Sequence, residues 1–254
     1  MFRALVLSAC LIGIVLGLAM TAMQAVGVTP ILLAAEQYEV SHGPQAVAGA
    51  HHDHGHAGQA GHHHDETAWA PADGTERLFY TAVSNILAGI GFAAILLVVM
   101  NQLHERGRLM MTAGRGLMMG GLCYLVVFVA PSLGLPPEIP GAAATALESR
   151  QLWWLATVIL AAAGLGLLIL ARGWQRGLGG LLLLAPYAWV PAHEGPLFSH
   201  PDPQAVAALT ELHHSFIWAS GLTNLAFWLL AGLLSVIALQ RLTGIAQGHE
   251  EARD

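Results

Sequence analysis

Six long apolar blocks constrain the fold of this chain more than any other feature of its sequence. An α-helix crosses the hydrocarbon core of a bilayer, about 30 Å thick, with about 20 residues at 1.5 Å rise each. Because no water satisfies backbone groups at that depth, each block is most simply a membrane-spanning α-helix. The blocks comprise residues 4–28, 78–100, 117–135, 152–171, 178–192 and 216–239.

The composition supports the membrane class. Of the residues, 55% are hydrophobic and only 10% are charged, against about 25% charged residues in soluble domains. We therefore predict an all-α integral membrane protein with about six transmembrane helices, embedded in the lipid bilayer. The predicted divisions are a first transmembrane helix at 1–28, a non-cytoplasmic histidine-rich loop at 29–77, a five-helix transmembrane bundle at 78–241 and a cytoplasmic tail at 242–254.

The basic residues predict the orientation, because cytoplasmic loops retain arginine and lysine during insertion. All ten basic residues are arginine, and with six spans and the N-terminus inside only Arg77 and Arg150 lie outside. The block 178–192 is short and contains Pro186 and Pro191, so a re-entrant segment is the alternative. Five spans would lower the count from eight against two to six against four. We predict a multi-pass protein of a bacterial inner (plasma) membrane with both termini in the cytoplasm.

A histidine-rich stretch within residues 29–77 is the most distinctive polar feature. In the predicted orientation, 12 of the 14 histidines lie outside. Neutral imidazole binds Co, Ni, Cu and Zn, and neighbouring carboxylates can complete a coordination shell. The loop has few large apolar side chains, so it should be disordered without metal and should form several exchanging chelates of poor selectivity. The predicted capture residues are His51, His52, His54, His56, His62, His63 and His64.

Cation capture by this loop should weaken in acid. Free imidazole titrates near pH 6.5, and the protonated ring cannot ligate a metal. A peptide of the loop titrated with Co²⁺ or Ni²⁺ is therefore expected to bind more weakly at about pH 5.5 than at about pH 7.5. Equal affinity at the two pH values would contradict imidazole ligation.

Selectivity requires ordered ligands near the outer ends of the spans, where ionisable groups are costly and therefore suggest function. Glu36 and Glu39 follow Pro30 and stand three residues apart, so they share a face if the helix resumes there. A solvated helix end is the alternative. His193 closes the block 178–192 and is a further candidate ligand. We predict that these side chains belong to a metal pathway.

A second candidate half-site precedes the last apolar block. Glu211 and His214 are three residues apart and share a helical face, whereas His213 and His214 point about 100° apart. One carboxylate and one imidazole on the same face could provide two ligands to a metal ion. An interfacial capping role is the alternative for this pair.

Polar residues within the blocks are few, and we expect them to form interhelical hydrogen bonds. Gly13 with Gly17 and Gly116 with Gly120 show the small-xxx-small spacing that lets membrane helices approach closely. The polar residues concerned are Gln24, Ser84, Asn85, Thr223 and Asn224.

Three segments resemble the CbtA family of predicted cobalt transporter subunits. Residues 133–141, Leu-Gly-Leu-Pro-Pro-Glu-Ile-Pro-Gly, and residues 150–154, Arg-Gln-Leu-Trp-Trp, are similar to the loop and fourth helix of that family. Residues 30–39, Pro-Ile-Leu-Leu-Ala-Ala-Glu-Gln-Tyr-Glu, are similar to the end of its first helix. With the spacing of the spans, the resemblance covers most of the chain.

The resemblance implies cobalt uptake, often together with cobalamin synthesis, and a small one-span, histidine-bearing partner named CbtB. The family usually carries a proline-histidine element in its fifth segment. Here Pro186 is followed by Tyr187, and His193 comes further on. The long histidine tract is an elaboration that could replace a capture function of the partner.

These features together predict a membrane subunit of a cobalt uptake transporter, with Ni²⁺ as another possible cargo. The sequence contains no lysine and hence no Gly-x-x-x-x-Gly-Lys phosphate loop, so its energy must come from a gradient or another subunit. We predict no enzymatic activity, no tightly bound cofactor beyond the transported Co²⁺ or Ni²⁺, and no nucleic-acid partner. A homo-oligomer, a metal-binding or sensing protein without transport, and a haem-binding oxidoreductase subunit stay open.

Overall fold

The computed structural model describes residues 2–40, 71–72, 74–191, 193 and 195–251. Apart from an isolated bridge between Ala142 and Phe198, all regular structure in these residues is helical. The elements are α1 (Phe2–Gly27), α2 (Thr29–Val40), α3 (Thr75–Glu105), α4 (Ala113–Tyr124), the π-helical η1 (Leu125–Val129), α5 (Ala130–Gly134), α6 (Leu147–Leu170), α7 (Trp174–Leu184), the 3₁₀-helical η2 (Ala185–Trp189) and α8 (Pro203–Glu251).

Five helical segments in the described part of the chain are long and apolar enough to cross a membrane. Their lengths run from 22 to 42 residues, against the roughly 20 that a bilayer requires. The all-α membrane class is confirmed. The segments are Arg3–Gly27, Thr75–Glu105, Ala113–Gly134, Leu147–Leu170 and Pro203–Gly244.

The helix observed at the predicted span 178–192 has other bounds and a less regular backbone than predicted. Helix α7 begins at Trp174 and has only 11 residues, and η2 continues it for five more. Pro186 stands in the first turn of η2, where its missing N–H ends the regular hydrogen-bond ladder of the α-helix. At 1.5 Å per residue in α7 and about 2.0 Å in η2, the segment spans about 26 Å, close to the thickness of the hydrocarbon core.

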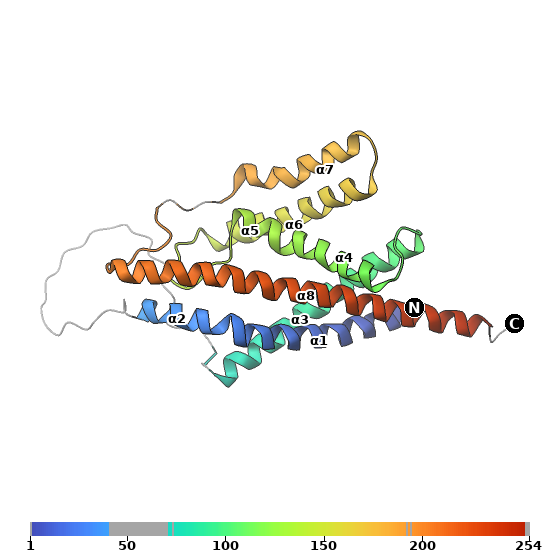
Figure 1. Ribbon diagram of the computed structural model, residues 1–254, viewed down its shortest axis with the longest axis horizontal. Helices are drawn as coiled ribbons and strands as arrows, with labels where there is room; N and C mark the ends of the chain where they lie inside the picture. The colour runs from blue at the N-terminus through green and yellow to red at the C-terminus, as the bar shows by residue number, and fades with distance from the viewer. Residues whose placement is uncertain (1, 41–70, 73, 192, 194, 252–254) are drawn as a thin grey trace, which may run out of the picture.

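Helix α7 returns alongside α6 (Figure 1), and two contacts fix the pair. A Cβ on either Gly164 or Gly179 would lie 2.7 Å from the carbonyl oxygen of the other, so the two backbones touch. The indole Nε1 of Trp153 donates to the carbonyl oxygen of Pro186 at 3.0 Å. The five long segments are the candidate spans among the described residues, and the shorter α7–η2 segment runs alongside α6. Helix α1 begins at the end of the bundle where α8 ends (Figure 1).

The segment predicted as the loop 29–77 is helical at both of its ends. Helix α2 occupies residues 29–40, and α3 begins at Thr75. Ala35 of α2 is fully buried in an apolar cluster with Phe198 and Phe216, and this burial supplies the apolar contact that makes a short helix stable. The predicted disorder of the histidine-rich stretch concerns residues that lie outside the described ones.

Close backbone contacts hold α1 against α3 and α4 against α8, as the glycine spacing predicts. A Cβ on Gly13 or Gly17 would collide with the backbone of Ile90 or Ile86. On α4, a Cβ on Gly116 would lie 2.7 Å from the carbonyl oxygen of Gly232. The bundle of α1, α3, α4 and α8 therefore forms the packed centre, and α6 and α7 lie to one side of it (Figure 1).

Candidate functional site

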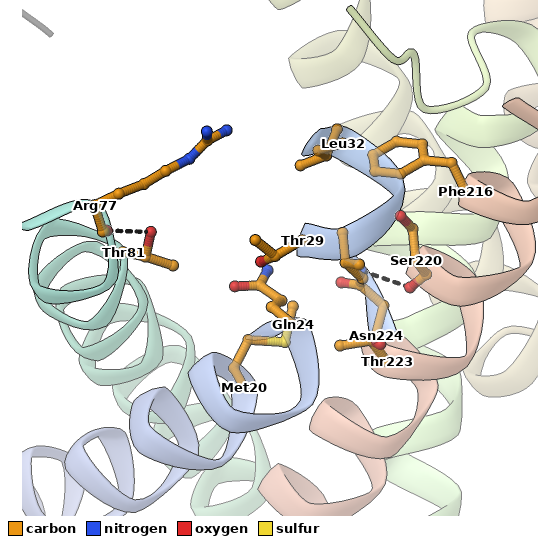
Figure 2. A pocket seen from close by; sticks show the side chains of 11 residues that line it. Met20, Gln24, Thr29, Leu32, Arg77, Thr81, Phe216, Ser220, Thr223 and Asn224 are labelled. Carbon is orange, nitrogen blue, oxygen red and sulfur yellow. Dashed lines mark hydrogen bonds between the residues drawn. The ribbon is translucent and has the colours of Figure 1, made fainter. Parts of the chain in front are cut away.

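A polar cleft of about 310 Å³ lies between α1, α2, α3 and α8. It is at the end of the bundle where α1 passes into α2 and where α3 begins (Figure 1). Figure 2 shows its side chains converging from these four helices. They are the polar Gln24, Thr29, Arg77, Thr81, Ser220, Thr223 and Asn224, with the apolar Met20, Val28, Leu32 and Phe216.

The α8 wall of the cleft carries three polar residues on one helical face. Ser220, Thr223 and Asn224 have the spacing i, i+3, i+4, which places them side by side. The side-chain nitrogen of Asn224 donates to the carbonyl oxygen of Ser220 at 2.9 Å. This bond fixes the amide within its own helix, and among the described residues no donor reaches its carbonyl oxygen. The α8 wall therefore presents hydrogen-bond acceptors to the cleft.

The opposite wall is braced by hydrogen bonds between α1 and α3. The side-chain nitrogen of Asn85 donates to Oε1 of Gln24 at 2.7 Å and to Oγ1 of Thr21 at 3.0 Å. Thr21 in turn donates to the carbonyl oxygen of Gly17 at 2.8 Å. The predicted interhelical hydrogen bonding of Gln24 and Asn85 is confirmed. It holds the Gln24 side chain in a fixed position at the edge of the cleft.

An ion pair stands at the cleft. Two guanidinium nitrogens of Arg77 donate to the two carboxylate oxygens of Glu36, at 2.6 and 3.1 Å. Both side chains keep about a third of their surface exposed, 31% for Arg77 and 32% for Glu36. Since α2 ends at Val40 and α3 begins at Thr75, this pair joins the two helices between which the histidine-rich stretch runs.

Four of the predicted metal residues, Glu36, His193, Glu211 and His214, have described side chains. Nε2 of His193 lies 3.4 Å from the carbonyl oxygen of Pro196, and Glu211 and His214 are exposed on α8. Glu39 belongs to α2, but its side chain is not among the described ones, and all seven predicted capture histidines also fall outside them. Within the part of the chain that the structure describes, no three His, Cys, Asp or Glu residues gather to hold a metal ion.

One buried histidine was not among the predicted site residues. His213 is only 9% exposed, and its Nε2 lies 3.0 Å from the carbonyl oxygen of Pro137. Its ring meets Phe198 edge-on, with ring centroids 5.8 Å apart. The signal was in the spacing, because Leu209, His213 and Phe216 recur at i, i+4, i+7 and are all buried. His213 fastens the loop after α5 to α8.

A second ion pair lies away from the cleft. Arg150 in the first turns of α6 contacts the carboxylate of Glu138 at 2.6 Å, with 30% and 18% of the side-chain surfaces exposed. Its shortest contact has the same length as that of the Arg77–Glu36 pair, but neither residue lines the cleft. It helps to fix the same loop that His213 holds.

Comparison with known proteins gives one match. A family model described as "Probable cobalt transporter subunit (CbtA)" matches residues 2–240. No curated protein matches the chain, and no solved structure does. The matched residues cover nearly the whole sequence, including every helix that forms the cleft.

Proposed function

The chain belongs to the CbtA family of probable cobalt transporter subunits, and we propose that it serves uptake of Co²⁺, and of Ni²⁺, after capture by its histidine-rich outer loop. Membership in a family of subunits implies that it works with other subunits in a membrane complex. Co²⁺ and Ni²⁺ are neighbours in the affinity order of nitrogen and oxygen ligands, so imidazoles that capture one also capture the other.

The position of the histidines along the chain supports this proposal. His51 to His64 lie between α2 and α3, and the Glu36–Arg77 ion pair joins these two helices beside the polar cleft. A cation bound to these histidines is therefore tethered to the cleft by the chain on both sides. Tethering raises the local cation concentration. This is the observation on which the proposal rests.

The loop and the bundle have different tasks in this proposal. Many closely spaced imidazoles gather cations without selecting among them. Glu36 is bonded to Arg77, which lines the cleft, and we propose that this carboxylate receives the cation from the loop. Glu39, His193, Glu211 and His214 would attract cations to the outer end of the bundle, since carboxylates and imidazoles are suitable ligands.

The remaining parts of the proposal concern partners and orientation. A small one-span, CbtB-like subunit is the proposed partner, and homo-oligomers are compatible with the lipid-facing surfaces. The chain contains no lysine, so energy for uptake would come from a gradient or another subunit. The arginine distribution supports both termini being cytoplasmic, in a bacterial inner membrane.

Cobalt accumulation in cells tests the proposal. Cells that express the intact chain with a candidate partner should accumulate more Co²⁺ and Ni²⁺ than cells without it. A chain lacking residues 42–66, and one in which the seven capture histidines are serine, should both take up Co²⁺ severalfold more slowly at limiting cobalt. Both should approach the intact chain at saturating cobalt, because the loop raises only the local concentration.

Two comparisons make the result decisive. If the serine-substituted loop behaves like the intact loop while the deletion does not, the loop acts through its length and capture by imidazole is wrong. Glu211→Ala and His214→Ala in the intact chain test those outer ligands separately. Unchanged metal content in every strain would refute transport and favour a protein that only binds metal.

A further inference from the structure

The polar cleft is large enough for a hydrated metal ion. A water molecule occupies about 30 Å³ of the liquid, so a divalent cation with an octahedral shell of six waters needs about 180 Å³. The cleft volume is about 310 Å³, so the hydrated ion fits. A bare cation would be too small to contact several walls at once, since direct ligands stand about 2 Å from a metal.

The chemistry of the walls also suits metal-bound water better than the bare metal. The lining includes Ser220, Thr223 and Asn224, whose hydroxyl and amide oxygens accept hydrogen bonds from coordinated water. It also includes Gln24, whose Oε1 accepts from Asn85 and keeps a second lone pair. The positive charge of Arg77, which lines the cleft, is balanced by Glu36. Bare Co²⁺ would call for imidazole or carboxylate ligands. Among the described residues no group of such side chains gathers here or elsewhere.

The acceptors are already held in place. The amide nitrogen of Asn224 is bound within α8, which turns its carbonyl oxygen outward. Asn85 holds Gln24 from the opposite side, and Figure 2 shows Gln24 and Asn224 reaching into the cleft from different helices. Acceptors fixed in this way lose little freedom when a ligand arrives, so even neutral groups give useful affinity.

We propose that the cleft binds the cation as its hydrated ion, through hydrogen bonds from the coordinated water to Gln24, Thr223 and Asn224. This step rests on the proposed uptake function and comes after release from the histidine-rich loop. Transport requires a site that holds its ion weakly enough to release it. Neutral groups acting through water meet that requirement.

An exchange-inert ion can distinguish binding in the cleft from ligation by the histidines. Hexaamminecobalt(III) resembles a hydrated cation in size and donates N–H bonds, but its ammonia ligands do not exchange, so imidazoles cannot replace them. We would introduce Met20→Cys into the full chain, because Met20 lines the cleft and is not one of the proposed ligands. Cys10 and Cys123 would be replaced by alanine, and labelling by a small cationic thiol reagent would be measured. Hexaamminecobalt(III) should slow the labelling at least about threefold, and excess potassium at the same ionic strength should not.

Uptake kinetics give a second measurement in the full chain. Asn224→Leu should raise KM for Co²⁺ about tenfold, as expected for losing hydrogen bonds to a charged ligand. Asn224→Asp should lower KM and slow release, because it adds a negative charge. Asn101→Leu is the matched control, since Asn101 bonds to Glu105 at the far end of α3 and should keep the wild-type KM.

The outcomes distinguish this inference from the proposed function. Protection of the M20C thiol by hexaamminecobalt(III) in a protein that accumulates no cobalt would support the cleft site and refute uptake. Measurable cobalt uptake without such protection, and with the same KM for the Asn224→Leu and Asn101→Leu variants, would overturn the cleft site and leave uptake standing.

Discussion

Replacing Gly120 by leucine should abolish recovery of the folded protein, whereas the same change at Gly121 should leave recovery near that of the wild type. A Cβ on Gly120 would collide with the carbonyl oxygen of Trp228 and lie 2.9 Å from its carbonyl carbon and 3.1 Å from Cα of Leu229. These atoms belong to the backbone of α8 and cannot rotate away. A Cβ on Gly121 would meet nothing within 4 Å.

The expected size of the effect follows from what holds membrane helices together. In lipid there is no hydrophobic force between helices, so association depends on close packing and hydrogen bonds. Overpacking a core with flexible side chains costs about 1–3 kcal/mol, and separating α4 from α8 would remove the contacts along both helices. Total stability is only about 5–15 kcal/mol. Leucine is also a better helix former than glycine, so helix propensity alone predicts that Gly120→Leu stabilises α4.

Size-exclusion chromatography in detergent provides the measurement. The Gly120→Leu variant should yield less than about a tenth of the wild-type monodisperse peak, and Gly121→Leu should give a comparable peak and thermal midpoint. Equal yields of the two variants would show that the α4–α8 contact is dispensable. Gly232→Leu, which removes space from the other side of the same contact, should fail like Gly120→Leu.

Neutralising the two members of the Arg77–Glu36 pair should change the KM for Co²⁺ uptake in opposite directions. Glu36→Gln leaves a net positive charge at the cleft, which repels a divalent cation, so KM should rise about tenfold. Arg77→Gln leaves the carboxylate available to the cation, so KM should fall by a similar factor. The double variant is neutral but lacks the receiving carboxylate, so its KM should lie between those of the wild type and Glu36→Gln. Initial uptake rates over a range of cobalt concentrations provide the measurement.

The Arg150–Glu138 pair supplies the matched control. It has the same 2.6 Å contact and similar exposure, but it does not line the cleft. Neutralising either of its members should leave KM within about twofold of the wild type, even if it lowers stability, because exposed charges beyond about 10 Å are largely screened. Changes of the same sign for Glu36→Gln and Arg77→Gln would mean that the pair acts only as a structural link.

The sequence predicted the interhelical contacts better than the candidate site. Gly13, Gly17, Gly116 and Gly120 were identified from their spacing, and the structure places all four against another backbone. The burial of His213 was not predicted, because the spacing of Glu211 and His214 does not reveal the buried row of Leu209, His213 and Phe216. Spacing states which residues share a face. It does not state which face meets a neighbour.

The bounds of the α7–η2 segment also differ from those predicted from the sequence. Hydropathy located the block 178–192 but missed Trp174, where the helix begins, and the change to η2 at Ala185. Pro186 signals an irregular backbone, but its carbonyl is bonded to Trp153, which lies 33 positions earlier. A distant donor of this kind cannot be recognised from the local sequence, and it stabilises the short segment against α6.

The sequence by itself determined the membrane class, the approximate positions of the passes, the glycine contacts and the histidine-rich stretch, because hydropathy and spacing act over one helix at a time. Only the tertiary structure decided that Gln24 and Asn224, 200 positions apart, line one cleft, and that Glu36 faces Arg77. Those meetings depend on how each helix is rotated about its axis. Side-chain packing against other helices fixes that rotation, and the order of residues within one helix does not specify it.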